Sequence, residues 1–152
     1  ISEEQFLAAP SEGDNSIAVI VKHVGGNLLS RWTDFLTSDG EKPGRNRDVE
    51  FEIIDGDTRG SLMQQWESGC AALFSALEPL SDADLERTVT IRGEPFTVLQ
   101  VTNLQLTHYS YHVVQIVYLA KHLAGSSWRT LSVSKGKSAD FNSKPTKYIQ
   151  SS

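Results

Sequence analysis

The chain of 152 residues carries a formal net charge of −5, contains 39% hydrophobic residues and has a single cysteine. This length predicts one domain, residues 1–152, with a buried core. The negative charge gives no electrostatic attraction to nucleic acid or to an anionic membrane, and no apolar run is long enough to span a bilayer. Because Cys70 is the only cysteine, no internal disulfide can form, which fits a cytoplasmic protein.

The first elements expected are a short helical segment in SEEQFLAA and a long helix that starts at an N-cap on Asp14 or Asn15 and ends near Thr37. Gly25 and Gly26 lie inside the long helix, where glycine predicts the close approach of a neighbouring element. The apolar stripe of this helix recurs at helical spacing and consists of Ile17, Ile20, Val21, Val24, Leu28, Phe35 and Leu36.

A second long helix is expected from about Thr58 to Leu77, after a polar loop, and SDAD then resembles a capping box that opens a short turn. The segment TVTIRGEPFTV predicts a small β-hairpin around Arg92-Gly93. A last long helix is expected from about Thr97 to Ala124, with a polar tail behind it. Three long amphipathic helices with short connections predict an all-α, antiparallel up-down bundle.

His108 and His112 lie four residues apart in the last long helix and point the same way, because they differ by about 40° around its axis. Imidazoles on a core-facing stripe need hydrogen bonds or a metal ion. Two interpretations stay open: core histidines that bond to the backbone or to glutamine, or two metal ligands. The shared face is mostly apolar and runs through Val101, Leu104, Ile116 and Leu119, with Gln105 and Gln115 at its edges.

A metal ion held by a helical histidine pair needs a third ligand from another helix. His23 is the candidate, because it lies beside the apolar stripe of the first long helix in a polar seam with Asn27, Ser30 and Asp34. The alternative is that His23 is a surface residue on a solvated face. His122 lies about 80° from the pair and is expected to interact with the helix C-terminus rather than to bind metal.

Two residues exclude familiar chemistries. Tyr109 stands where a zinc peptidase of the His-Glu-x-x-His type carries its glutamate, which disfavours proteolysis by that mechanism. Cys70 lies mid-stripe in the second helix, between Trp66 and Phe74, and is expected to fill the core rather than to act as a nucleophile.

The segments NSIAVIVKHVGGNLLSRWTDFLTSDGEKP and LTHYSYHVVQIVYLAKHL resemble the DinB-like superfamily of bacterial metal-binding helical bundles, and most closely a branch of unknown function. The resemblance covers roughly residues 14 to 142. It implies that His23, His108 and His112 together bind one divalent metal ion, nickel or zinc. It also implies a candidate activity, because some relatives join a low-molecular-weight thiol such as bacillithiol or mycothiol to an electrophile.

On this resemblance the chain is expected to be a metal-dependent thiol transferase. The alternatives are a non-catalytic metal-binding bundle with a structural or ligand-binding role, and a metal-dependent hydrolase. Lys42, Arg45 and Arg47 in the first loop can hold the carboxylates of a thiol co-substrate, or they can simply be solvated.

The superfamily bundle has four helices, and its first helix normally precedes the segment SEEQFLAAP, which here lies at the start of the sequence. The resemblance therefore implies a four-helix type of bundle with its first helix missing or truncated. A three-helix remnant exposes one flank of its core, so a homodimer is expected. Alternatively, an upstream helix covers that flank in the full gene product.

Overall fold

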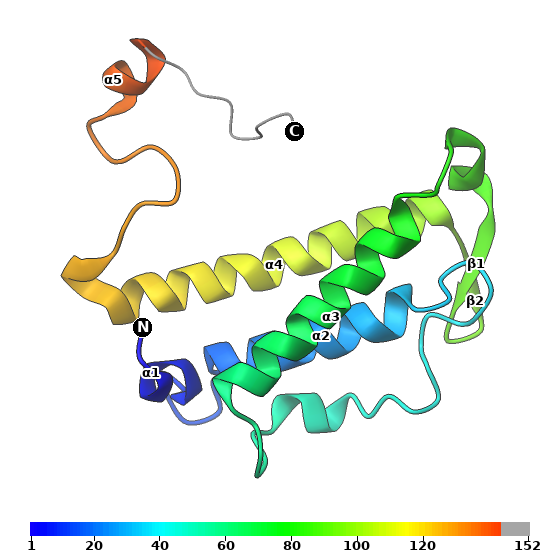
Figure 1. Ribbon diagram of the computed structural model, residues 1–152, viewed down its shortest axis with the longest axis horizontal. Coiled ribbons are helices and arrows are strands. Elements are labelled where there is room, and N and C mark those ends of the chain that lie inside the picture. Colours follow the sequence, from blue (N-terminus) through cyan, green and yellow to red (C-terminus); the bar gives the residue numbers. More distant parts are fainter. Residues whose placement is uncertain (144–152) are drawn as a thin grey trace.

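The computed structural model describes residues 1–143 and is mostly helical (Figure 1). The all-α class and the small hairpin directly before the last long helix are both confirmed. In chain order the elements are α1 (Glu3–Leu7), α2 (Ile17–Trp32), the 3-10 helix η1 (Asp48–Phe51), α3 (Arg59–Leu77), the 3-10 helix η2 (Asp82–Glu86), β1 (Thr88–Ile91), β2 (Glu94–Thr97), α4 (Val98–Ala124), the 3-10 helix η3 (Gly125–Ser127) and α5 (Ser138–Ser143).

Helix α2 differs from the prediction at both ends. Its N-cap is Ser16, whose side chain accepts a hydrogen bond from the Val19 N–H, so the predicted caps at residues 14 and 15 were wrong. Its last residue is Trp32, well before Thr37. The helix ends because its C-cap, Thr33, has an extended backbone, and Asp34 after it lies in the left-handed region with φ 49°. Residues 33–37 consequently form the turn that leads into the loop.

The two other long helices start where the sequence predicted. Thr58 caps α3 and Thr97 caps α4, and both residues form capping boxes with the third residue of their helix. Gly125 ends α4 with a positive φ of 52°, as a C-capping glycine commonly does. The short turn predicted in SDAD is η2, which also carries a capping box, between Ser81 and Asp84.

Helix α2 packs closely against α3 through glycine. A Cβ atom added to Gly69 would meet the Leu28 Cβ at 2.6 Å and the Gly25 carbonyl oxygen at 3.2 Å. A Cβ added to Gly25 would meet the backbone nitrogen of Trp66 at 3.3 Å. The close approach predicted for the glycine pair in α2 is therefore confirmed for Gly25, which faces α3.

Helix α2 is the central element, and its buried residues lie on every side rather than on one stripe. Its apolar residues contact α3, α4 and the hairpin in one large cluster. A second cluster joins the first turns of α2 and α3 to α1, where Phe6 is 3% exposed. Its polar residues are buried as well, and they are Lys22, His23, Asn27, Ser30 and Arg31.

The hairpin is tied to the loop that follows α2. Its turn residues Arg92 and Gly93 have positive φ values of 56° and 77°, as tight two-residue hairpin turns require. The Asp39 carboxylate accepts hydrogen bonds from the backbone N–H groups of both turn residues and from that of Glu41. These hydrogen bonds hold the pKa of Asp39 down at about 2, and they fix the position of Arg92 relative to the loop.

Helix α4 is covered on one side only (Figure 1). Its buried residues include Val101, Gln105 and His112, which face α2. The predicted face was wrong in one detail, because Leu104 is 49% exposed and Gln105, expected at an edge, is 4% exposed. After α4 the chain leaves the bundle and ends its described part in α5. Within residues 1–143, no helix is both long and apolar enough to cross a membrane.

Candidate metal centre

His23 lies at the middle of α2, in the interface between α2, η1 and α4. It is 3% exposed, so the alternative of a solvated surface residue is wrong. Its ring packs against Phe51 of η1, with ring centroids 4.6 Å apart. From the other side it meets the two histidines of α4, at centroid distances of 5.3 Å for His108 and 5.0 Å for His112.

The three histidines form one cluster. One ring nitrogen from each lies within 4.8 Å of the nitrogens offered by the other two, and the rings of His108 and His112 are perpendicular, with centroids 4.7 Å apart. Nε2 of His23 lies 3.3 Å from Nε2 of His108. Two nitrogen ligands about 2.0–2.1 Å from a tetrahedral ion are about 3.3–3.4 Å apart, so this spacing suits a shared ion.

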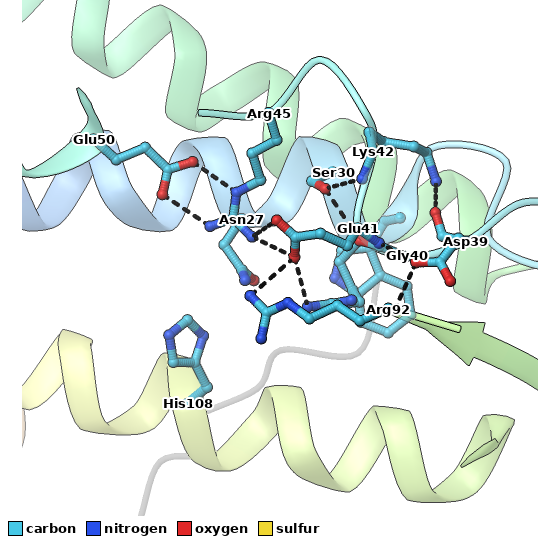
Figure 2. Close-up of polar contacts among 12 residues, drawn as sticks. Asn27, Ser30, Asp39, Gly40, Glu41, Lys42, Arg45, Glu50, Arg92 and His108 are labelled. Carbon is cyan, nitrogen blue, oxygen red and sulfur yellow. Dashed lines mark hydrogen bonds and ion pairs between the residues drawn. The ribbon is translucent and has the colours of Figure 1, made fainter. Parts of the chain in front are cut away.

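Glu50, on η1, fixes the orientation of His23. Nδ1 of His23 donates to Glu50 Oε2 at 2.8 Å, which leaves Nε2 with its lone pair facing the α4 histidines. Arg45 donates to both oxygens of the same carboxylate, at 2.7 Å from Nε and 2.8 Å from Nη2 (Figure 2). The carboxylate lies directly against the backbone of Gly26, where any Cβ would clash with it. The second glycine of α2 therefore makes room for this carboxylate.

The protonation states follow from these contacts. Burial raises the pKa of Glu50, but the hydrogen bonds from Arg45 and His23 outweigh it, and the pKa ends below its usual range. Burial, followed by the neighbouring histidines, lowers the pKa of His108 to about 4. Burial also lowers the pKa of His112. At neutral pH, His108 and His112 are therefore neutral imidazoles, the form that binds metal.

His112 is oriented by a residue of its own helix. Its Nδ1 donates to Gln115 Oε1 at 2.8 Å, which leaves Nε2 free to act as a ligand. Of the two histidines of α4, only His112 forms the predicted hydrogen bond to a glutamine, and it does so through Nδ1 alone. Nδ1 of His108 is buried and has no hydrogen-bond partner among the described residues.

Tyr109 serves the fold rather than the chemistry. Its hydroxyl accepts a hydrogen bond from Trp32 Nε1 at 2.9 Å and donates to Asn27 Oδ1 at 3.0 Å. Burial raises its pKa above the usual range, so it stays protonated. The position that holds the general base in a zinc peptidase is thus occupied by a neutral group that links α4 to α2.

The other candidate residues lie away from the cluster. His122 is exposed in the last turn of α4. Cys70 is half-buried and packs against the core, and burial raises the pKa of its thiol, which fits the predicted role of core filler. The Lys42 ammonium donates to Ser38 and to the Asp39 carbonyl oxygen.

Arg45 and Arg47 differ in their surroundings. Arg45 is neither solvated nor free, because it bridges Glu50 and Glu41. Arg47 is exposed, with its guanidinium 4.9 Å from the Phe51 ring centroid. Both line an open pocket of about 210 Å³ beside the cluster, which His23 and His108 also line.

Glu50 is the residue that the sequence did not point to. It lies 27 positions after His23, in a loop whose path no periodicity predicts. A hint was present in the pair Arg45 and Glu50, of opposite charge and five residues apart, which the loop folds into a bidentate contact. Nothing in that spacing indicated that the carboxylate would reach a histidine of α2.

Three imidazoles from α2 and α4 thus converge in the bundle interior, in a cluster that could hold a metal ion. The chain belongs to the family described as protein of unknown function DUF1572, whose model matches residues 1–137. The match includes all three histidines and Glu50. No curated protein and no solved structure gives a significant match to the chain.

Proposed function

We propose that the protein binds one divalent metal ion, nickel or zinc, through Nε2 of His23, His108 and His112. The observation that carries this proposal is the convergence of the three rings within 4.8 Å, with Glu50 and Gln115 holding the outer nitrogens of two of them. Imidazole is a ligand that suits both metals. The resemblance to the DinB-like superfamily, in which matching positions bind a divalent ion, supports the same assignment.

We further propose that the site transfers a low-molecular-weight thiol to an electrophile, a reaction that some members of that superfamily carry out. We place this activity in the cytoplasm. A divalent ion with three protein ligands keeps open positions and stabilises a thiol as thiolate at neutral pH. In the transfer the sulfur forms a bond to carbon, the leaving group departs with its electron pair, and the thiol proton goes to solvent. The chain's part is to hold the rings in place through Glu50 and Gln115.

The pocket favours a reactive or ligand-binding role over a purely structural one. A structural metal site is closed by four protein ligands. Here three histidines cluster, and two of them line an open pocket of about 210 Å³. A hydrolase is the second alternative, and a general base beside the site would assist it. The nearest carboxylate, Glu50, is already bonded to His23 and Arg45.

Metal analysis of the purified protein tests the first proposal. We expect one ion per chain, and a severe loss of metal from each of the single variants His23→Ala, His108→Ala and His112→Ala. His122→Ala is the matched control, because it removes an exposed histidine from the same helix as two of the ligands. Full metal retention in His23→Ala would remove the proposed third ligand.

A conjugation assay tests the second proposal. The metal-loaded protein should accelerate the reaction of a cellular thiol, bacillithiol or mycothiol, with a model electrophile, and a chelator should abolish the acceleration. If metal is bound but no thiol in a broad panel reacts faster than the uncatalysed rate, the binding role becomes the better proposal. In that case the metal assignment stands and the transferase does not.

A further inference from the structure

The pocket beside the histidine cluster is rich in arginine. Within the described residues, four guanidinium groups line it, contributed by α2, by the loop after α2 and by the hairpin, and His23 and His108 of the histidine cluster line it as well. In Figure 2 the side chain of Arg92 runs beneath Glu41, on the side of the loop that faces His108. The four residues are Arg31, Arg45, Arg47 and Arg92.

The buried side-chain polar atoms that lack a hydrogen-bond partner in the described chain all belong to residues that line this pocket. They are Nε and Nη1 of Arg31, Oε1 of Gln105 and Nδ1 of His108, and each of these residues lines it. Arg31 is 5% exposed, yet its ion-pair contact is a long one, 3.9 Å from Nη2 to Glu41 Oε2. Buried polar groups are normally hydrogen-bonded, so several unpaired ones in the wall of one cavity indicate a missing polar partner.

The charge of the pocket indicates what that partner is. The four guanidinium groups share two carboxylates, Glu41 and Glu50, of which Glu50 is bonded bidentately to Arg45. Glu41 lies between Arg31, Arg45 and Arg92, at 3.9, 3.2 and 3.3 Å. Four guanidinium groups with two carboxylates leave the pocket positively charged, and the buried Arg31 has only its long contact to Glu41 as a charged partner.

Close packing holds the Arg31 guanidinium in place. A Cβ on Gly40 would meet Arg31 Nη1 at 2.6 Å, so only glycine leaves space for the guanidinium here. Burial is the main cause of the lowered pKa of Arg31, and Arg45 and Arg92 contribute to it. An arginine fork with free Nε and Nη donors matches the geometry of a carboxylate or phosphate.

We propose that this pocket is an oxyanion subsite, which takes a carboxylate or phosphate group of a small molecule through Arg31, with Arg92 and Arg47 at its mouth. Its volume of about 210 Å³ holds the charged end of a ligand rather than a whole one. The unpaired Gln105 oxygen accepts a hydroxyl or amine of the same molecule. That the subsite orients a reactant towards the histidines rests on the proposed function. That it binds an anion does not depend on that function.

The test is a titration of the full chain, as purified and after chelation, with acetate, succinate and inorganic phosphate, followed by NMR of the arginine Nε–H signals. We expect saturable shifts, including the Arg31 signal, with and without metal. Whether the carboxylates or phosphate bind more tightly identifies the chemical class. Absence of saturable binding by all three probes at tens of millimolar would overturn the subsite. Anion binding in a protein that never holds metal would leave the subsite standing and remove the metal function.

A matched pair of hairpin variants connects the binding to this pocket. Arg92→Gln should weaken anion binding about tenfold, because it removes a charge-assisted donor. Arg87→Gln is the control, since Arg87 belongs to the same hairpin region, has a similarly exposed side chain and pairs with Asp84 away from the pocket. Equal weakening by both would mean general charge attraction and would overturn the proposal. Arg31→Gln should abolish anion binding. If that variant fails to fold, the comparison of Arg92→Gln with Arg87→Gln still decides the proposal.

Discussion

The two faces of α2 differ in what they bury. Towards α3, the helix presents Gly25 and Leu28 and comes so close that a Cβ at Gly69 would clash with Leu28. Towards α4 and η1, the same helix presents His23, Asn27 and Arg31, all at most 5% exposed. One face gains stability from close apolar packing, and the other buries polar groups that apolar packing alone cannot satisfy. The contrast separates the half of α2 that holds the fold from the half that forms the candidate site.

A single substitution at Glu50 should have the largest effect on the polar face. Glu50→Ala leaves Arg45 buried without its bidentate partner and releases Nδ1 of His23. We expect a loss of about 3–5 kcal/mol in the free energy of unfolding and a loss of about 10–100-fold in metal affinity. Urea unfolding and competition with a chelating dye measure the two quantities.

Glu50→Gln is the conservative comparison for that experiment. It keeps an oxygen that can accept from His23 and fills the same volume against Gly26. It should therefore retain more metal affinity than the alanine variant. Equal metal affinity in the wild type and in Glu50→Ala would mean that the carboxylate does not orient His23.

The apolar face should respond at Gly69. Gly69→Ala places a Cβ at 2.6 Å from Leu28 Cβ, so the two helices must move apart. We expect a loss of about 1–3 kcal/mol in the free energy of unfolding, without a change in metal stoichiometry.

Gly60→Ala provides the matched control in the same helix. Its Cβ meets only the Thr58 hydroxyl, at 3.7 Å, so it should stabilise α3 by about 0.5–1 kcal/mol through helix propensity. If both substitutions change stability by the same amount, the close crossing of α2 and α3 is not what Gly69 provides.

The difference between the two faces of α2 also explains which parts of the fold and of the candidate site could be predicted from the sequence. Local signals were strong for the helices, because capping residues such as Thr58 and Thr97 act within one turn. The histidines of α4 were visible because their spacing is local too. Glu50 and Arg31 were not identified, since their roles arise where a loop folds back over α2. Contacts over such separations leave no periodic trace, and the resemblance that connected His23 to the pair carried information that spacing lacked.

A smaller effect is expected where the hairpin meets the loop. Asp39→Ala removes the acceptor for three backbone N–H groups, at Glu41, Arg92 and Gly93. The hairpin turn should loosen and oxyanion binding through Arg92 should weaken several-fold, with metal content unchanged. Because the folded-state pKa of Asp39 is about 2, against 3.8 ordinarily, its contribution is complete above pH 3.8 and is lost as pH falls towards 2.

Unfolding midpoints measured at pH values from 2 to 5 check the acid range, and the variant should show a flatter dependence than the wild type. An unchanged slope would assign the acid sensitivity to other carboxylates. Anion titration at neutral pH, where Asp39 is fully ionised, reports on Arg92 separately. Metal loss from Asp39→Ala would contradict the view that the hairpin serves only the oxyanion pocket.

The smallest change in chain stability, and a large change in assembly, should follow substitutions on the uncovered side of α4. We propose that two copies of the chain form a homodimer there. Leu99, Leu106 and Val113 recur every seven residues and are 43%, 64% and 43% exposed, and Val114 beside them is 66% exposed. A seven-residue apolar repeat is the spacing at which two helices pack along their length. The repeat of exposed residues lies on the side of α4 away from His112, so association of two chains there would leave the candidate site open.

Light scattering at high micromolar concentration should therefore give the mass of two chains. Burial of apolar surface contributes about 25 cal/mol per Å², so a charge in the middle of the repeat should prevent association. Leu106→Asp should give a monomer. At a chain concentration too low for either protein to dimerise, its free energy of unfolding should differ from that of the wild type by less than about 0.5 kcal/mol, because the side chain is already exposed. Phe74→Asp is the control, since Phe74 is 58% exposed on α3 and lies outside the repeat, and that variant should remain a dimer. A wild-type protein that stays monomeric at high micromolar concentration would rule out a second copy as the cover of α4.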